Sequence, residues 1–157
     1  MNVYQGSIEG IKGVLIYKID GTEYCSDIQN VAAIMRIDEV KQHTNQNYLS
    51  QIEFDHSVFS IIDLHKIYKT KLLKQTDSIR IILHEMFGKN FCFFVDKVIE
   101  ILSTDRLFME NSIDLLPYSG KSFIKYILKY QKRNIFIPDF EKITRRLYKL
   151  NDFHQMA

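Results

Sequence analysis

The sequence predicts a mainly β protein, built as small barrels or a sandwich, that closes with a C-terminal helix. Three observations support this prediction. About eight or nine short runs are rich in β-branched and aromatic residues. Turn signals separate these runs at close spacing, so most strands are expected to return through hairpins and to pair antiparallel. One amphipathic helical pattern follows the last run.

The first elements are a hairpin and a capped helix. Val14–Ile19 is β-branched and aromatic, and Glu23–Cys25 is expected to return beside it. Asp20-Gly21, between them, is one of the best hairpin signals, because both turn positions need a positive φ. Asp27 suits the N-cap of a short helix that follows.

The middle of the chain alternates between loops and strands. The polar stretch of residues 38–51 predicts a loop. Ser57–Ile62 predicts a strand, and Asp63 after it can cap a helical turn. Apolar and polar side chains alternate in Ile79–His84, which places His84 on the face opposite the apolar residues. We therefore expect His84 to face solvent.

Two further strands follow a turn. Gly88-Lys89 is expected to turn the chain into Asn90–Val95, and Lys97–Leu102 continues as another strand after Asp96. A run of phenylalanines in Asn90–Val95 can serve as a base-stacking platform, but an apolar core strand is much the commoner use of such a run. We interpret it as core.

The last elements are a hairpin and a helix. Ile124–Tyr130 alternates as a strand should, and Lys132-Arg133-Asn134 is expected to turn it back into Asn134–Ile137. Asp139 suits an N-cap, and apolar residues recur behind it at helical spacing. This pattern predicts a C-terminal helix over about 139–152.

The composition is that of one globular domain. The chain has 157 residues and a mass of 18.6 kDa, with 46% apolar and 25% charged residues, which excludes a disordered chain. No stretch is long and apolar enough to span a membrane, and the N-terminus has no pattern of a secretory signal. Cys25 and Cys92 each lie in an apolar run, as expected for buried, reduced thiols. We expect a single domain over residues 1–157 in a cytoplasmic protein.

The net charge of +2 hides an uneven distribution. Residues 121–149 hold nine Lys/Arg and two Asp/Glu, a balance of +7, whereas the remainder carries −5. Such a segment can attract an acidic partner or nucleic acid. A solvated helix face, with lysines at strand positions that face water, is the simpler interpretation, so nucleic-acid binding is kept as an alternative.

Nothing in the sequence indicates an enzyme. The five histidines form no zinc-binding pattern, and His65 is expected to be an exposed helix residue. The letters of a hydrolase triad occur in Asp55, His56, Ser57, Ser60 and Asp63, but a triad is defined by geometry and no GxSxG surrounds either serine. No glycine-rich phosphate loop is present. We therefore predict a non-enzymatic protein without a metal or a cofactor.

Four stretches carry motifs that occur together in one family. The first is an aliphatic strand and a turn followed by Tyr24–Ile34, which is similar to a Y-x-hydrophobic-x-I-x-x-V-x-x-I segment. The second, Ile61–Leu64, is similar to P-I-hydrophobic-D-L. Phe94–Leu102 resembles V-V-D-x-V-x-x-V-L, and Ile135–Ile143 resembles a closing strand and helix. Together the stretches span residues 13–145 in the right order. In this respect the chain resembles the CheW-like domain, the coupling module of bacterial chemotaxis.

The resemblance implies two five-stranded SH3-like β-barrels, intertwined around one shared core, with short helices and a C-terminal helix. It also implies a scaffold without catalytic activity that joins chemoreceptor cytoplasmic tips to the regulatory domain of a CheA-type histidine kinase. In the family a barrel end pairs with the kinase, and a groove between barrels holds the receptor helix hairpin, by apolar anchors. The expected partner-binding residues are Val31, Ile34, Asp55, Phe94, Asp96 and Val98.

The chain also departs from the family pattern. Phe54-Asp55-His56 stands where the family usually writes L-R-G, so the charge is reversed and a glycine is replaced. Ser60 replaces the proline of the second motif, and Ala33 stands for a family glutamate. These departures leave open a diverged CheW-like regulator with a different protein partner.

Overall fold

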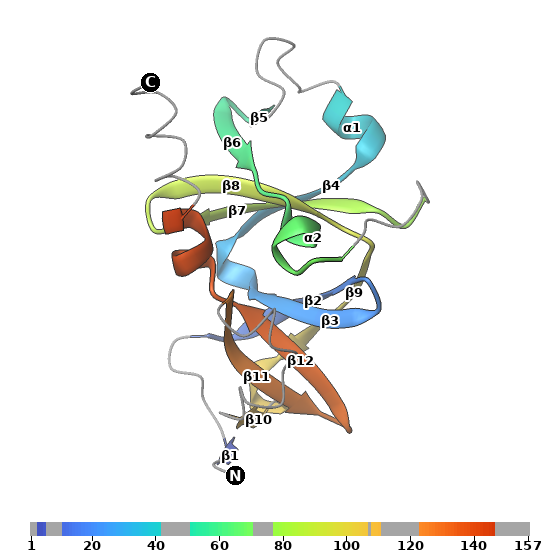
Figure 1. The fold of residues 1–157 in the computed structure, drawn as a ribbon, viewed down its shortest axis with the longest axis vertical. Helices are drawn as coiled ribbons and strands as arrows, with labels where there is room; N and C mark the ends of the chain where they lie inside the picture. The colour runs from blue at the N-terminus through green and yellow to red at the C-terminus, as the bar shows by residue number, and fades with distance from the viewer. Residues whose placement is uncertain are drawn as a thin grey trace.

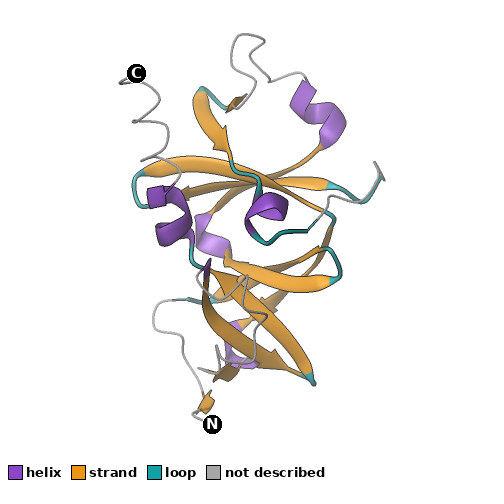
Figure 2. Cartoon of the chain, in the orientation of Figure 1, coloured by secondary structure: helices purple, strands orange, loops and turns teal. Residues whose placement is uncertain are grey.

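The computed structural model describes residues 3–5, 11–41, 51–70, 77–106, 108–110 and 123–146, and within them it has two β-sheets and a few short helices (Figures 1 and 2). The first sheet contains, in spatial order, β1 (Val3–Gln5), β10 (Phe108–Glu110), β11 (Ile124–Tyr130), β12 (Arg133–Pro138), β3 (Thr22–Asp27), β2 (Gly13–Ile19) and β9 (Lys97–Ser103). The second contains β4 (Val31–Arg36), β7 (Arg80–Met86), β8 (Lys89–Val95), β6 (Ser57–Ile61) and β5 (Gln51–Phe54).

The helical elements are short. They are the 3-10 turns η1 (Ile28–Asn30) and η2 (Thr104–Arg106), the helices α1 (Ile37–Lys41) and α2 (Leu64–Ile67), and a helix over residues 140–146. Side chains of Asp27, Asp63 and Asp139 cap three of them, with Oδ1 accepting from the backbone N–H of Gln29 at 3.0 Å, Lys66 at 3.1 Å and Lys142 at 3.1 Å. All three aspartate caps were predicted from the sequence, and each is confirmed.

The chain builds the second sheet in the middle of its path. β1 to β3 belong to the first sheet, β4 to β8 form the second, and β9 to β12 return to the first (Figure 1). Most strand pairs are antiparallel, and the two exceptions, β12 with β3 and β6 with β8, join strands that are distant in sequence. The C-terminal helix then leaves the first sheet and packs on the second, through contacts of Phe140 with Phe91 and Phe93.

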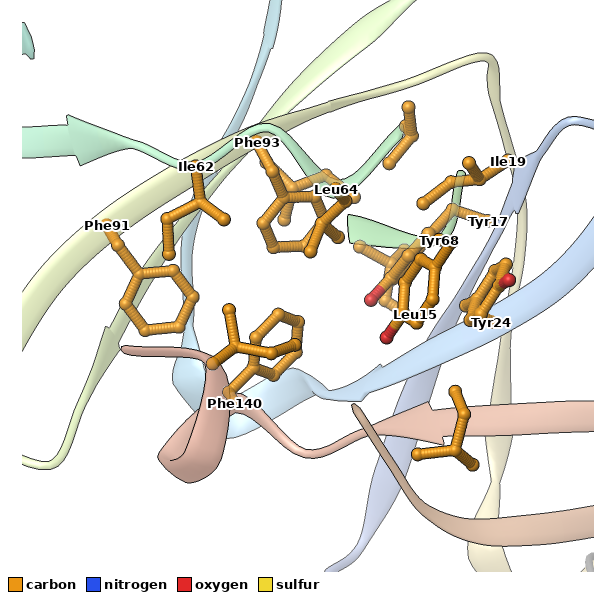
Figure 3. Packing of buried hydrophobic residues seen from close by; sticks show 14 of the residues in the cluster. Leu15, Tyr17, Ile19, Tyr24, Ile62, Leu64, Tyr68, Phe91, Phe93 and Phe140 are labelled. Atoms are coloured by element: carbon orange, nitrogen blue, oxygen red, sulfur yellow. The ribbon is translucent and has the colours of Figure 1, made fainter. Parts of the chain in front are cut away.

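Three apolar clusters hold these parts together. One lies inside the first sheet and contains Val14 and Ile16, and a second lies inside the second sheet and contains Met35 and Ile52. The largest is shared, because it takes residues from both sheets, from α2 and from the C-terminal helix (Figure 3). β2 is buried on both faces, since Val14 and Ile16 face the first cluster while alternate residues, such as Tyr17, face the shared one.

The predicted fold class is confirmed. The fold is mainly β, it has two β units around a shared core, and its helices are short. The second sheet has the five expected strands. In the first sheet five longer strands, β11, β12, β3, β2 and β9, are extended at one edge by the three-residue strands β10 and β1.

Two turns lie one residue earlier than the sequence suggested. The turn between β7 and β8 is Phe87-Gly88, with φ of 56° and 66°, rather than Gly88-Lys89, and the turn between β11 and β12 is Gln131-Lys132, with φ of 48° and 63°. In both cases the turn needs two successive positive-φ residues, and the following basic residue already pairs in the next strand. Asp20-Gly21, with φ of 49° and 78°, is confirmed.

The predicted loop over residues 38–51 is partly wrong. The helix α1 spans Ile37–Lys41, and the Glu39 carboxylate accepts the Arg36 N–H at 3.0 Å at its start. This local side-chain contact stabilises the first turn of α1. The polar composition of residues 38–51 gave no indication of this turn. Residues 42–50 lie outside the described part of the chain. The strand β4 was not predicted as a strand, because a β-bulge between Val31 and Ala33 interrupts its alternation.

The described C-terminal helix begins at Phe140, directly after the predicted cap Asp139. Its predicted continuation to about residue 152 lies outside the described residues, which end at 146.

Candidate functional site

A β-bulge places two of the expected partner-binding residues on one face of the second sheet. Val31 pairs with His84 and Ile34 pairs with Ile82, two positions of β7 that point to the shared core. Residues three apart would lie on opposite faces of a regular strand, but the extra residue of the bulge brings them to the same face. Val31 packs against the shared core, whereas Ile34 is 41% exposed.

A third expected residue comes from the first sheet. Val98 of β9 pairs with Tyr17 and packs, half-buried, against the same shared core. Val31, Ile34 and Val98 therefore all lie on the faces that the two sheets turn toward each other. We call these three residues the inter-sheet face.

Phe94 and Asp55 lie away from the inter-sheet face. Phe94 pairs with Ile81 and packs half-buried against the interior of the second sheet, on the face opposite Ile34, where it also lines a cavity of about 490 Å³ beside α2. Asp55 is exposed in the turn between β5 and β6. Asp55 and His56 have φ of 49° and 64°, so the turn adopts the left-handed region even without the family's glycine.

Asp96 lies in the interior. Its Oδ1 is 2.9 Å from Nε2 of His65, and its Oδ2 accepts the backbone N–H of Asp20 at 2.7 Å. Asp96 and His65 are only 3% and 5% exposed. The carboxylate therefore fastens α2 and the β2–β3 turn to the β8–β9 connection, and it reaches no solvent-facing partner in this arrangement.

The expected exposure of His65 is wrong, and the reason is tertiary. The helix α2 has only four residues, and it lies against the β8–β9 connection. The side chain of His65 therefore points inward, toward Asp96. A local pattern gives no sign of a carboxylate that is 31 residues away in sequence.

The expected exposure of His84 is also wrong. The predicted alternation of β7 is correct, but the C-terminal helix covers the other face, so His84 is fully buried. The rings of Phe91, Phe93 and Phe140 surround it, with centroids 5.2, 5.1 and 4.9 Å away. Burial lowers the pKa of His84 to about 3, so its imidazole is neutral at pH 7.

The described part of the basic segment is partly neutralised by ion pairs. Arg133 donates to Glu23 and, at 3.1 Å, to Glu100, and these hydrogen bonds, led by Glu23, raise its pKa. Arg145 donates to Glu141 at 2.8 Å. Carboxylates of this chain therefore already pair with both guanidinium groups. This agrees with the simpler interpretation of the basic segment, a solvated face with a structural role.

The thiols are buried as predicted. Cys25 and Cys92 are both free and inaccessible, and burial raises the pKa of each, that of Cys92 to about 12. Within the described residues, no group of three or more His, Cys, Asp or Glu side chains is placed to hold a metal ion. No helix in the same part of the chain is long and apolar enough to cross a membrane.

The comparisons with known proteins agree with this architecture. The family model of the CheW-like domain matches residues 13–147. The crystal structure of the scaffolding protein TtCheW from Thermoanaerobacter tengcongensis is similar, with a TM-score of 0.60 at 20% sequence identity, covering 82% of this chain and 88% of that chain. No curated protein matches the sequence. The chain therefore belongs to the CheW-like domain family, whose domains are non-catalytic scaffolds of chemotaxis signalling.

Proposed function

We propose that this protein couples the cytoplasmic tip of a chemoreceptor to a CheA-type histidine kinase in the cytoplasm, by protein–protein binding alone. The observation that carries the proposal is the inter-sheet face, which combines an exposed aliphatic side chain, Ile34, with two valines that pack half-buried on the shared core. Single exposed apolar side chains are common on folded domains, so exposure alone does not support the assignment. Its support is the position of Ile34 on the face that the second sheet turns toward the first.

The chemistry of this face suits a receptor helix. An amphipathic helix docks through apolar anchors at i, i+3 and i+4, and it needs an aliphatic surface with one accessible projection. Ile34 is the exposed side chain that a helix can contact, and the half-buried Val31 and Val98 add apolar surface on the same inter-sheet face. We assign the receptor to this face.

The other expected residues take different parts. Asp55 is exposed at the β5–β6 turn and contacts a partner directly. Phe94 lines the cavity beside α2 and offers apolar area to a partner there. Asp96 is buried and acts by holding the β8–β9 connection, which positions Val98 two residues later.

Replacing Ile34 by lysine tests the receptor assignment. A lysine at this exposed position leaves the fold intact but places an ammonium group in an apolar contact, so receptor binding is expected to weaken at least tenfold, about 1.4 kcal/mol. Val58→Lys is the matched control, because Val58 is also an exposed aliphatic residue, at 50%, on a strand of the same sheet. Isothermal titration with a receptor hairpin fragment and with the kinase regulatory domain gives the two affinities separately.

Equal effects of Ile34→Lys and Val58→Lys on receptor affinity would remove the assignment to the inter-sheet face. Absence of binding to both fragments at about 100 μM would remove the coupling function itself.

A second candidate is a diverged regulator of the same family with a different protein partner. The exposed carboxylate of Asp55, at a position where the family usually has arginine, favours it. The absence of the family glutamate at position 33 supports this candidate less strongly, because Ala33 packs against the interior of the second sheet. The exposed residue next to it is Ala32. Purification of native complexes distinguishes the candidates, since coupling predicts recovery of a receptor or a CheA-type kinase and divergence predicts another regulator.

A further inference from the structure

His84 is a buried imidazole without a hydrogen-bond partner. Neither Nδ1 nor Nε2 bonds to any described residue, and both atoms are inaccessible to solvent. A neutral imidazole carries one donor and one acceptor, and a buried polar group left unbonded already destabilises the fold. A positive charge in the same place would be far more costly, so the folded state accepts this imidazole only in its neutral form.

Aromatic and aliphatic side chains enclose the histidine. The rings of Phe91, Phe93 and Phe140 lie around it, and Val31 of β4 and Phe91 of β8 are its cross-strand partners. Burial lowers the pKa of His84 for this reason. At pH 5 the imidazole can therefore take up a proton only where the enclosure opens.

No other group beside His84 changes its charge between pH 7.5 and pH 5. The titratable and charged groups that line the adjacent cavity of about 660 Å³ are Cys25, Asp27, Lys125, Tyr126, Asp139 and Glu141. None of them bonds to His84. Across this range carboxylates are ionised, and ammonium groups, buried thiols and phenols keep their protons. A response to pH in this part of the protein therefore reports on His84.

The C-terminal helix is the part of the enclosure that can move most easily. β7 lies between β4 and β8 and pairs with both, so the strand that carries His84 is held on each side. The helix over residues 140–146 is held instead by side-chain packing of Phe140 and Ile143 in the shared core. Peripheral segments of this kind open at a lower free energy than central strands. Phe140 lines the same cavity as His84, so displacement of its ring brings the imidazole to that cavity.

We propose that His84 and the C-terminal helix form an acid-sensitive latch, in which proton uptake by His84 accompanies release of residues 140–146 from the second sheet while both sheets stay folded. The imidazole is charged only in the released state, where water can hydrate it. Acid therefore shifts the equilibrium toward release. The latch needs no partner, so it does not depend on the adaptor role.

The size of the shift follows from the pKa of His84 in the two states. This pKa is about 3 in the closed state and has the ordinary value of about 6.5 in the released state. Below pH 6.5 the released state binds more protons, so release becomes more favourable as the pH falls. For a single proton, the equilibrium constant for release is expected to rise about 30-fold between pH 7.5 and pH 5.

Native-state hydrogen exchange of the ¹⁵N-labelled full chain measures the release. The reporter is the Ile143 N–H, which donates to the Asp139 carbonyl at 3.0 Å. Amides of β2 report on global unfolding, because that strand is buried on both faces. After correction for intrinsic exchange rates, the opening constant at Ile143 is expected to rise about 30-fold from pH 7.5 to pH 5. It is also expected to respond less to urea than the β2 amides, since a local opening exposes little surface.

Two histidine variants test the assignment to His84. His84→Phe removes the titrating group and keeps an aromatic ring among the neighbouring rings, so opening at Ile143 is expected to lose its pH dependence. His56→Asn is the matched control, because His56 belongs to the same sheet but is exposed in the β5–β6 turn. This control is expected to keep the full rise of about 30-fold.

Two results in the wild-type protein overturn the latch without any variant. One is an opening constant at Ile143 that changes less than about threefold between the two pH values. The other is a urea dependence at Ile143 equal to that of the β2 amides, because the helix would then be released only by global unfolding. A pH dependence that persists in His84→Phe, or that disappears in His56→Asn, overturns the assignment to His84.

Discussion

At the scale of single residues, the histidines show how burial changes a role. His65 is buried with a carboxylate partner, Asp96, and His84 is buried with none among the described residues. Both follow patterns that indicated exposure, and in both cases the covering element is distant in the sequence. A paired buried histidine contributes hydrogen bonding, whereas an unpaired one costs free energy unless a ligand or solvent bonds to it.

His84→Phe is expected to stabilise the protein and to reduce the dependence of its stability on pH. The pKa of His84 is about 3 in the folded state and about 6.5 when unfolded, so below pH 6.5 the unfolded state binds more protons and stability falls as the pH falls. Between pH 7.5 and pH 5 this single group accounts for a loss of about 2 kcal/mol.

Urea unfolding at pH 7.5 and pH 5 measures this linkage. His84→Phe should lose about 2 kcal/mol less than the wild type between the two pH values. His56→Asn is the control, because His56 is exposed in a turn with a φ of 64° that asparagine tolerates. An identical pH dependence in wild type and His84→Phe would contradict the burial of a neutral imidazole.

At the scale of elements, the hairpin turns show which local signals are strong. Asp20-Gly21 was found from the sequence, because glycine accepts a positive φ without strain. Gln131-Lys132 has the same backbone form without glycine, and its position was predicted one residue late. The strand pairs on both sides of that turn impose its conformation against the preference of its residues.

Lys132→Gly is therefore expected to raise the free energy of unfolding by about 1 kcal/mol, because the φ of 63° is strained for lysine and free for glycine. Gly21→Ala is expected to lower it by a similar amount, since a Cβ there meets no atom within 4 Å and only the φ of 78° opposes it. Chemical denaturation measures both. A destabilising Lys132→Gly would show that its side chain contributes more than the backbone strain costs.

At the scale of the whole molecule, the C-terminal helix joins the two sheets. It starts from β12 of the first sheet and packs Phe140 onto β8 of the second, within the shared core (Figure 3). The same packing covers His84. Phe140 also lines a cavity of about 660 Å³ between the ends of β3, β7 and β12. The relative position of the two sheets therefore depends on a side chain near the C-terminus.

Phe140→Ala is expected to destabilise the protein by about 3–5 kcal/mol, because it removes a buried aromatic ring from the shared core. Phe87→Ala is the matched control, since Phe87 is 52% exposed in a turn and should cost less than about 1 kcal/mol. Thermal and urea unfolding give both values. Similar losses in the two variants would show that the helix does not join the sheets as described.

The sequence by itself determined the mainly β class, the hairpin at Asp20-Gly21, the three aspartate caps and the family, because these depend on local backbone preferences and on motifs read in order. Only the tertiary structure decided that Val31 and Ile34 share a face, since a bulge shifts their register. Only the tertiary structure, too, buried His65, His84 and Asp96. Burial depends on which element covers a face, and the covering elements here come from distant parts of the chain.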